Sequence, residues 1–191
     1  GIQGRPPVIP TSAAVGANPY RGLQAFDVAD SGLFFGREAL TDWLRSDLRS
    51  SLASRGASRL LAIVGASGSG KSSLARAGLL AQLAAGDLEG SAHWPQIILK
   101  PGADPLASLA IASADALALG ADDAAVLTFQ DRLLADARSL HTRASLALRG
   151  SPVGTRLVLL VDQFEELFTL CPSEQHRHAF IDNLLHAAGV T

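Results

Sequence analysis

The fold of this chain is decided by one short segment, Gly65-Ala66-Ser67-Gly68-Ser69-Gly70-Lys71-Ser72-Ser73. Its spacing is G-x-x-x-x-G-K-[ST], in which the glycines let the backbone curl until several N–H groups point at phosphate oxygens. The ammonium group of Lys71 would reach the β- and γ-phosphates, and the hydroxyl of Ser72 would bind Mg²⁺. The segment therefore predicts a phosphate-binding loop, and the simpler alternative is a flexible Gly/Ser turn.

The residues on either side of this loop favour the phosphate site. An apolar run at residues 60–64 precedes the loop and predicts a buried strand. A helix-forming segment, residues 73–83, follows it, and we expect this helix to end near Gly86. A strand, a loop and a helix in this order are the context that the motif requires, and the positive end of the helix dipole would face the phosphates.

A second landmark is the acidic residue Asp162, which ends the apolar run at residues 156–161. That run predicts a buried parallel strand, and ligands bind beyond the carboxyl ends of such strands in open α/β sheets. Mg²⁺ takes one or two carboxylates besides the phosphates, so Asp162 is expected to hold it, directly or through water. A strand-end cap is the alternative for Asp162.

Two further carboxylates, Glu165 and Glu166, follow Asp162 within one turn. Either could orient or deprotonate a water that attacks the terminal phosphate. The alternative for each is a solvent-exposed carboxylate in the first turn of a helix. The residues alone do not choose between the two glutamates.

The remaining pattern is that of an α/β protein, with a parallel sheet flanked by helices in three layers (α/β/α). A helix is predicted from residue 39, with one apolar face over residues 39–48, and it is expected to end before Gly56. The other predicted elements are a strand over 96–100, a helix from Asp104-Pro105 to about Leu119, one or two helices within 122–148, and a helix over 173–188. Residues 1–17, with three prolines, predict a linker, so the folded domain is expected to begin at residue 18.

The composition is that of a globular domain, because 48% of the 191 residues are hydrophobic. A net charge of −2 with scattered basic residues argues against direct binding of nucleic acid or an anionic membrane. No apolar run of transmembrane length and no leader pattern occur, so a cytoplasmic setting is expected. The single cysteine, Cys171, predicts a core residue, and the absence of methionine predicts a piece of a longer protein.

Several short motifs accompany the phosphate loop: Asn18-Pro19-Tyr20-Arg21-Gly22-Leu23, Phe34-Phe35-Gly36-Arg37-Glu38, Pro101-Gly102-Ala103-Asp104-Pro105 and Val161-Asp162-Gln163-Phe164-Glu165-Glu166-Leu167-Phe168. Together with the loop they resemble the novel STAND NTPase 1 family, from about residue 18 to the end. The resemblance implies a P-loop NTPase fold that stops after the Walker B strand and its following helix. The later strands with the sensor residue, the helical lid and the winged-helix region would lie beyond Thr191.

The resemblance also implies roles for individual residues. Gly36 and Arg37 would line the adenine and ribose side of the nucleotide, and Asp162 would be the Mg²⁺-binding Walker B acid. Glu165 or Glu166 would correspond to the catalytic acidic position. Many additional-strand ATPases carry a glutamate directly after the Walker B acid, whereas this chain has Gln163 there, so the choice between the two glutamates stays open.

The function implied by the resemblance is a bacterial signal-transduction switch that binds ATP or ADP with Mg²⁺ and hydrolyses ATP slowly. Such proteins carry an N-terminal effector domain and C-terminal repeats in the same chain and self-associate, so hydrolysis is expected mainly in the full-length protein. One alternative is a small-molecule or nucleoside kinase, although no Arg-rich lid segment is present. Another is an interaction module without hydrolysis, although Gly70, Lys71, Ser72 and Asp162 are all intact.

Overall fold

The computed structural model describes residues 25–54, 59–120 and 122–189. The predicted linker and the motif at residues 18–23 lie outside them. The described helices are η1 (Val28–Leu33), α1 (Glu38–Ala53), α2 (Lys71–Ser73), η2 (Leu74–Leu80), α3 (Ala81–Ala85), η3 (Ser91–His93), α4 (Pro105–Ser113), α5 (Asp123–Ala135), α6 (Ser139–Ala147), α7 (Glu166–Thr169) and α8 (Glu174–Ala188).

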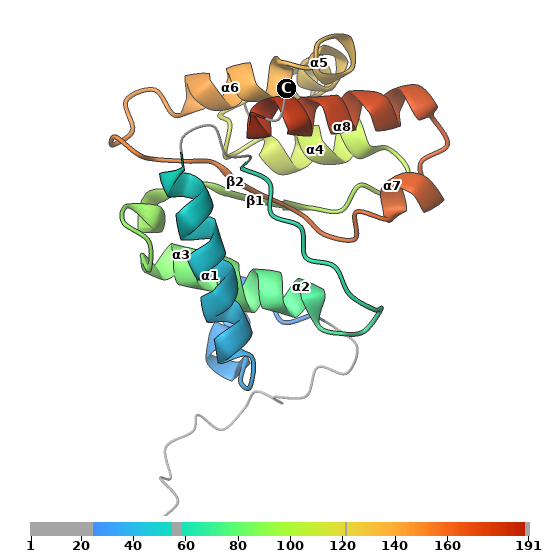
Figure 1. The fold of residues 1–191 in the computed structure, drawn as a ribbon. Helices are drawn as coiled ribbons and strands as arrows, with labels where there is room; N and C mark the ends of the chain where they lie inside the picture. The colour runs from blue at the N-terminus through green and yellow to red at the C-terminus, as the bar shows by residue number, and fades with distance from the viewer. Residues whose placement is uncertain (1–24, 55–58, 121, 190–191) are drawn as a thin grey trace, which may run out of the picture.

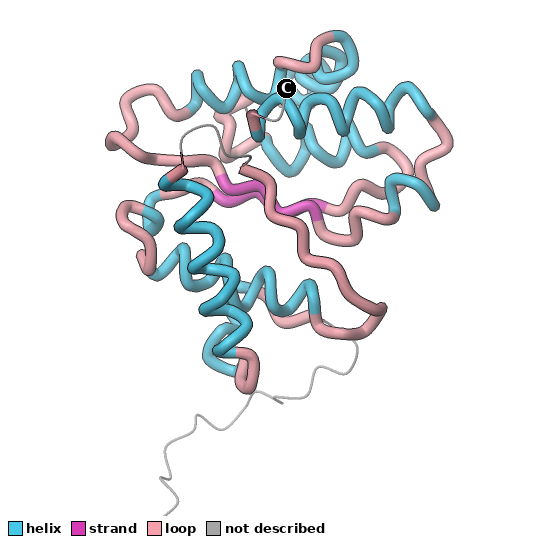
Figure 2. The backbone as a smooth tube through the Cα atoms, viewed as in Figure 1, coloured by secondary structure: helices cyan, strands magenta, loops and turns pink. Residues whose placement is uncertain are grey.

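Two parallel strands, β1 (Gln96–Leu99) and β2 (Val158–Val161), lie between two groups of helices (Figure 1, Figure 2). Their register pairs Gln96 with Val158 and Leu99 with Val161. The ladder continues one step further, because the amide of Asp162 donates to the carbonyl of Leu99 at 2.8 Å. Both strands were predicted, and the chain is helix-rich with a small parallel sheet, which agrees with the α/β prediction at this coarse level.

The strand side chains alternate between two apolar clusters, because successive residues of a strand point to opposite faces. Ile97 and Leu99 belong to the cluster that includes Phe180, whereas Ile98 packs against the cluster that includes Leu83. Helices α4, α5, α6 and α8 lie on the first side of the sheet, and α1, α2 and α3 lie on the second (Figure 1). The sheet has two strands within the described residues, so a full three-layer P-loop core stays a prediction.

The helix after the phosphate loop is continuous, since α2, η2 and α3 follow one another from Lys71 to Ala85. It ends at Gly86, whose φ of +90° is the left-handed conformation that glycine adopts readily, so the predicted stop is confirmed. Its middle part, η2, is π-helical. Such segments are rare and occur frequently at functional sites.

The starts of two further helices, α4 and α8, are fixed by hydrogen bonds from side-chain caps. The carboxylate of Asp104 accepts from the amide of Ala107 at the start of α4, and Ser173 accepts from His176 at the start of α8. The predicted extension of α4 to about Leu119 is wrong, because α4 ends at Ser113. The chain then turns, with Ala118 at a φ of +50°, and Leu117 is fully buried in the core.

The apolar run at residues 60–64 is extended but is not a strand, which corrects the prediction. Leu61 and Ile63 pack against the second cluster, whereas Leu60 and Val64 are 58% and 92% exposed. Within the described part of the chain, no backbone hydrogen bond joins residues 61–64 to β1 or β2. The apolar pattern predicts burial of one face, but a strand also needs a hydrogen-bonded neighbour, which a local pattern does not specify.

A close contact between η2 and α1 sets the position of the N-terminus of α1. A Cβ atom on Gly78 would lie 2.9 Å from Oγ1 of Thr41, which is 3% exposed and donates to the carbonyl of Arg37. Thr41 cannot turn away without losing that hydrogen bond. Gly78 therefore allows the helix after the loop to approach α1 closely.

We expect Gly78→Ala to lower the free energy of unfolding by about 1–2 kcal/mol, because overpacking outweighs the higher helix propensity of alanine. The matched control is Gly32→Ala, since a Cβ atom at Gly32 meets nothing within 4 Å. Urea unfolding of the three proteins measures the difference. Equal stability of the Gly78 variant and the parent would show that the contact can relax freely.

Candidate nucleotide site

The phosphate loop turns back on itself between the extended run and α2. Gly68 and Gly70 have φ angles of +74° and +85°, and the amide of Ser69 donates to the carbonyl of Ala66 at 3.2 Å. Gly70 is also the N-cap of α2. Residues 65–70 are exposed, so an anion can approach this part of the loop and the start of the long helix.

The charged head group of Lys71 lies over the beginning of this loop. Its Nζ atom donates to the carbonyl oxygens of Gly65 and Ala66, each at 2.8 Å. These contacts keep the ammonium beside the loop backbone. The loop therefore carries a local cation within its own turn, and contact of this ammonium with phosphates stays a prediction.

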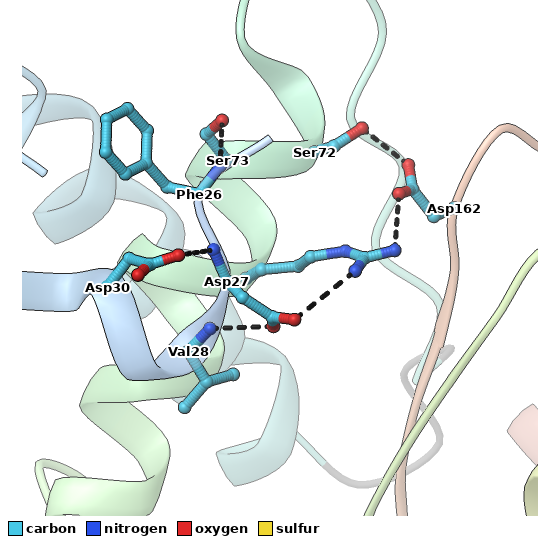
Figure 3. Close-up of polar contacts among 8 residues, drawn as sticks. Phe26, Asp27, Val28, Asp30, Ser72, Ser73 and Asp162 are labelled. Atoms are coloured by element: carbon cyan, nitrogen blue, oxygen red, sulfur yellow. Dashed lines mark hydrogen bonds and ion pairs between the residues drawn. The ribbon is translucent and has the colours of Figure 1, made fainter. Parts of the chain in front are cut away.

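The two residues predicted to hold Mg²⁺ are in direct contact, although they are 90 positions apart in the chain. The hydroxyl of Ser72 donates to Oδ1 of Asp162 at 2.6 Å (Figure 3). Asp162 follows β2 and is 8% exposed. A hydroxyl and a carboxylate are hard oxygen ligands of the kind that Mg²⁺ binds, so this pair fits the ion.

The donor set also fits a metal that is shared with phosphates. Within the described residues, no group of three or more His, Cys, Asp or Glu side chains could enclose a metal ion. Mg²⁺ is usually held by one or two carboxylates together with phosphate oxygens and waters. The pair Ser72 and Asp162 matches that arrangement.

A third residue at this carboxylate, Arg76, was not predicted from the sequence. Its Nη2 atom lies 2.9 Å from Oδ2 of Asp162, and its Nη1 atom lies 3.8 Å from Oδ2 of Asp27 (Figure 3). Arg76 is four positions after Ser72 in a helix, a spacing that places both side chains on one face. The four-residue spacing of Ser72 and Arg76 is the sequence feature that could have indicated this contact.

Arg37 brings a second positive group to the phosphate loop. Its Nη2 atom donates to the carbonyl of Ser69 at 3.3 Å. The preceding residue, Gly36, has a φ of +81°, and its amide donates to Oε1 of Glu38 at 2.9 Å. The amides of Glu38 and Gly36 lower the pKa of Glu38, so its carboxylate stays charged and holds the turn that presents Arg37.

The structure distinguishes the two glutamates after Asp162. Gln163 adopts a φ of +55°, so the chain turns sharply at the end of β2 and begins α7 at Glu166. Oε2 of Glu166 accepts from the amide of Gly102 at 3.2 Å, whereas Glu165 is exposed. No side chain or amide of the described residues holds the Glu165 carboxylate, so it is available for another partner.

The family model of the novel STAND NTPase 1 family matches residues 19–191 of this chain. The chain belongs to this family. The match includes the phosphate loop, Arg37 and the segment after β2. No curated protein and no solved structure matches the chain.

Membership in the novel STAND NTPase 1 family indicates a nucleotide-binding signalling protein. The geometry agrees with this at a general level. The glycine-rich loop and Lys71 lie at the start of the helix from Lys71 to Ala85, and the contact of Ser72 with Asp162 joins that helix to the end of β2. None of the helices in the described ranges has the length and apolar character needed to cross a membrane.

Proposed function

We propose that this chain binds ATP with Mg²⁺ through the loop Gly65–Ser73 and acts as the nucleotide switch of a STAND signalling protein. The observation that carries the proposal is the contact of Ser72 with Asp162 at 2.6 Å, directly beside the phosphate loop. A loop alone would bind many anions, whereas a hydroxyl and a buried carboxylate beside it select a phosphate group with a hard metal ion.

Each group at the loop has a proposed role. Backbone N–H groups of the loop and the start of the helix at Lys71 bind phosphate oxygens, and the ammonium of Lys71 neutralises their charge. Arg37 reaches the same loop and contributes a second positive charge, and Gly36 lets the chain pass close to the nucleotide. When bound, Mg²⁺ would neutralise charge on the phosphate oxygens and would be held by Ser72 and Asp162.

Glu165 is the proposed residue that accepts a proton from the attacking water, because its carboxylate is exposed whereas that of Glu166 is bonded to Gly102. Hydrolysis is proposed to be slow, since transfer of the terminal phosphoryl group also needs positive charge placed by further parts of a STAND protein. Bound ATP would then favour one signalling state and hydrolysis would end it.

A prediction for Asp162 tests the metal site. We expect Asp162→Asn to lower the Mg²⁺ enhancement of ATP binding at least about tenfold, because the amide carries no charge to attract the ion. Calorimetry with ATP in Mg²⁺ and in EDTA gives the enhancement as a ratio of dissociation constants. Asp131→Asn, on the exposed face of α5, is the control. An unchanged ratio for the Asp162 variant would show that another group holds the metal.

The alternatives make different predictions in solution. A small-molecule or nucleoside kinase would transfer the phosphoryl group of ATP to an added acceptor faster than to water. An interaction module without hydrolysis would bind ATP and leave it intact in the full-length protein. Strong preference for GTP over ATP in the same calorimetric titrations would contradict the adenine nucleotide.

A further inference from the structure

The carboxylate of Asp162 is held on both of its oxygens. Oδ1 accepts from the hydroxyl of Ser72 at 2.6 Å, and Oδ2 accepts from Nη2 of Arg76 at 2.9 Å. The side chains of Asp162 and Arg76 are 10% and 19% exposed, so the pair is largely screened from water. A carboxylate held at two oxygens has little freedom to rotate.

The same arginine reaches a second anchor in another part of the chain. Nη1 of Arg76 lies 3.8 Å from Oδ2 of Asp27, whose Oδ1 accepts from the amide of Val28 as the N-cap of η1. The amide of Phe26 donates to Oγ of Ser73 at 3.0 Å. Residues 26–33 are therefore bonded to the helix that follows the phosphate loop at two points (Figure 3).

We propose that Arg76 is the positioning residue of the site, which holds the Asp162 carboxylate toward Ser72 and couples it to residues 26–33 through Asp27. This inference rests on the proposed role of Asp162 at Mg²⁺. Arg76 binds Oδ2 and leaves Oδ1 on the side of Ser72, so it orients the carboxylate without occupying the oxygen that faces the hydroxyl. Coupling between two sites is reciprocal, so bound Mg²⁺ and nucleotide would also stabilise the attachment of residues 26–33.

The first test compares the Mg²⁺ enhancement of ATP binding in Arg76→Gln, Asp27→Asn and the double variant. Arg76→Gln should lower the enhancement about fivefold or more, as loss of a partner that orients a metal ligand does. Asp27→Asn should lower it about two- to threefold, the size that an exposed ion pair supports. The double variant should resemble Arg76→Gln alone, because Asp27 acts through Arg76.

A second readout does not depend on turnover. Hydrogen exchange at residues 26–33 should slow when Mg²⁺ and ATP are added to the parent chain, and should not slow in Arg76→Gln. Thermal unfolding confirms that each variant is folded, and Arg76→Lys, which keeps the charge but not the two-armed guanidinium, should rescue only part of the effect. Asp47→Asn, an exposed change on α1, is the control.

The outcomes separate this inference from the proposed function. If Asp162→Asn loses the Mg²⁺ enhancement while Arg76→Gln keeps it or raises it, Arg76 does not position the carboxylate and the inference fails alone. Full additivity of Arg76→Gln and Asp27→Asn, or equal slowing of exchange in Arg76→Gln and the parent, would also overturn it. If the parent chain shows no Mg²⁺ enhancement, the proposed function itself fails.

Discussion

Lys71→Ala is expected to lower the affinity for ATP with Mg²⁺ by about a hundredfold, which corresponds to about 3 kcal/mol. Its Nζ atom lies against the carbonyls of Gly65 and Ala66, within the turn whose amides are proposed to bind the phosphates. Phosphate oxygens would then lose one of the two cations that the described residues place at the loop, and the other, Arg37, donates to the carbonyl of Ser69. Arg37 alone would neutralise less of the phosphate charge than Lys71 and Arg37 together.

Calorimetric titration with ATP and with GTP measures this effect. Arg132→Ala is the control, because it removes a cation from the exposed face of α5. Arg37→Ala should give an intermediate loss of affinity if both cations act at the phosphates. Binding of ATP by the Lys71 variant as tight as by the parent would contradict a phosphate site at this loop.

The shape of the glycine-rich loop and the place of Asp162 at a strand end could be predicted from the sequence, because each depends on a local pattern, whereas binding of phosphate and Mg²⁺ there stays a prediction. The glycine spacing requires positive φ angles, and Gly68 and Gly70 have them. An apolar run that ends in an acid predicts a carboxylate at a strand end, and Asp162 lies there beside Ser72. The parallel strands followed from apolar runs, and the start of α4 at Asp104 and the stop at Gly86 followed from capping residues.

The parts that the sequence did not predict depend on contacts between distant segments. Residues 60–64 have the apolar pattern of a strand, but whether they form one depends on a hydrogen-bonded neighbouring strand, which they lack within the described residues. The position of Arg37 at Ser69 depends on the close approach of α1 to Gly78. From the sequence alone, Arg76 has the pattern of an ordinary exposed helix residue. Its contacts with Asp162 and Asp27 arise only when β2 and residues 26–33 pack against this helix.

Glu165→Gln is expected to slow hydrolysis of bound ATP by about 10²–10⁴-fold, the contribution of a positioned general base, while the affinity for ATP stays within about threefold. The backbone of Glu165 is fixed, since its carbonyl accepts from Oγ1 of Thr169 at 3.1 Å. Its side chain is exposed near the end of β2, four residues after Val161. A carboxylate on a fixed backbone, with no partner among the residues that the structure describes, can bind a water molecule.

Single-turnover hydrolysis of ATP by the parent chain and the variants tests this assignment, together with calorimetry to separate binding from chemistry. Glu166→Gln should reduce the rate less, because Oε2 of Glu166 already accepts from the amide of Gly102. Its main effect should be a lower unfolding temperature, since a hydrogen bond to a neutral amide is weaker than one to a carboxylate. Glu89→Gln, an exposed change after α3, is the control. A larger loss of rate in Glu166→Gln than in Glu165→Gln would assign the base to Glu166, and the hydrogen bond to Gly102 would then have to open before the reaction.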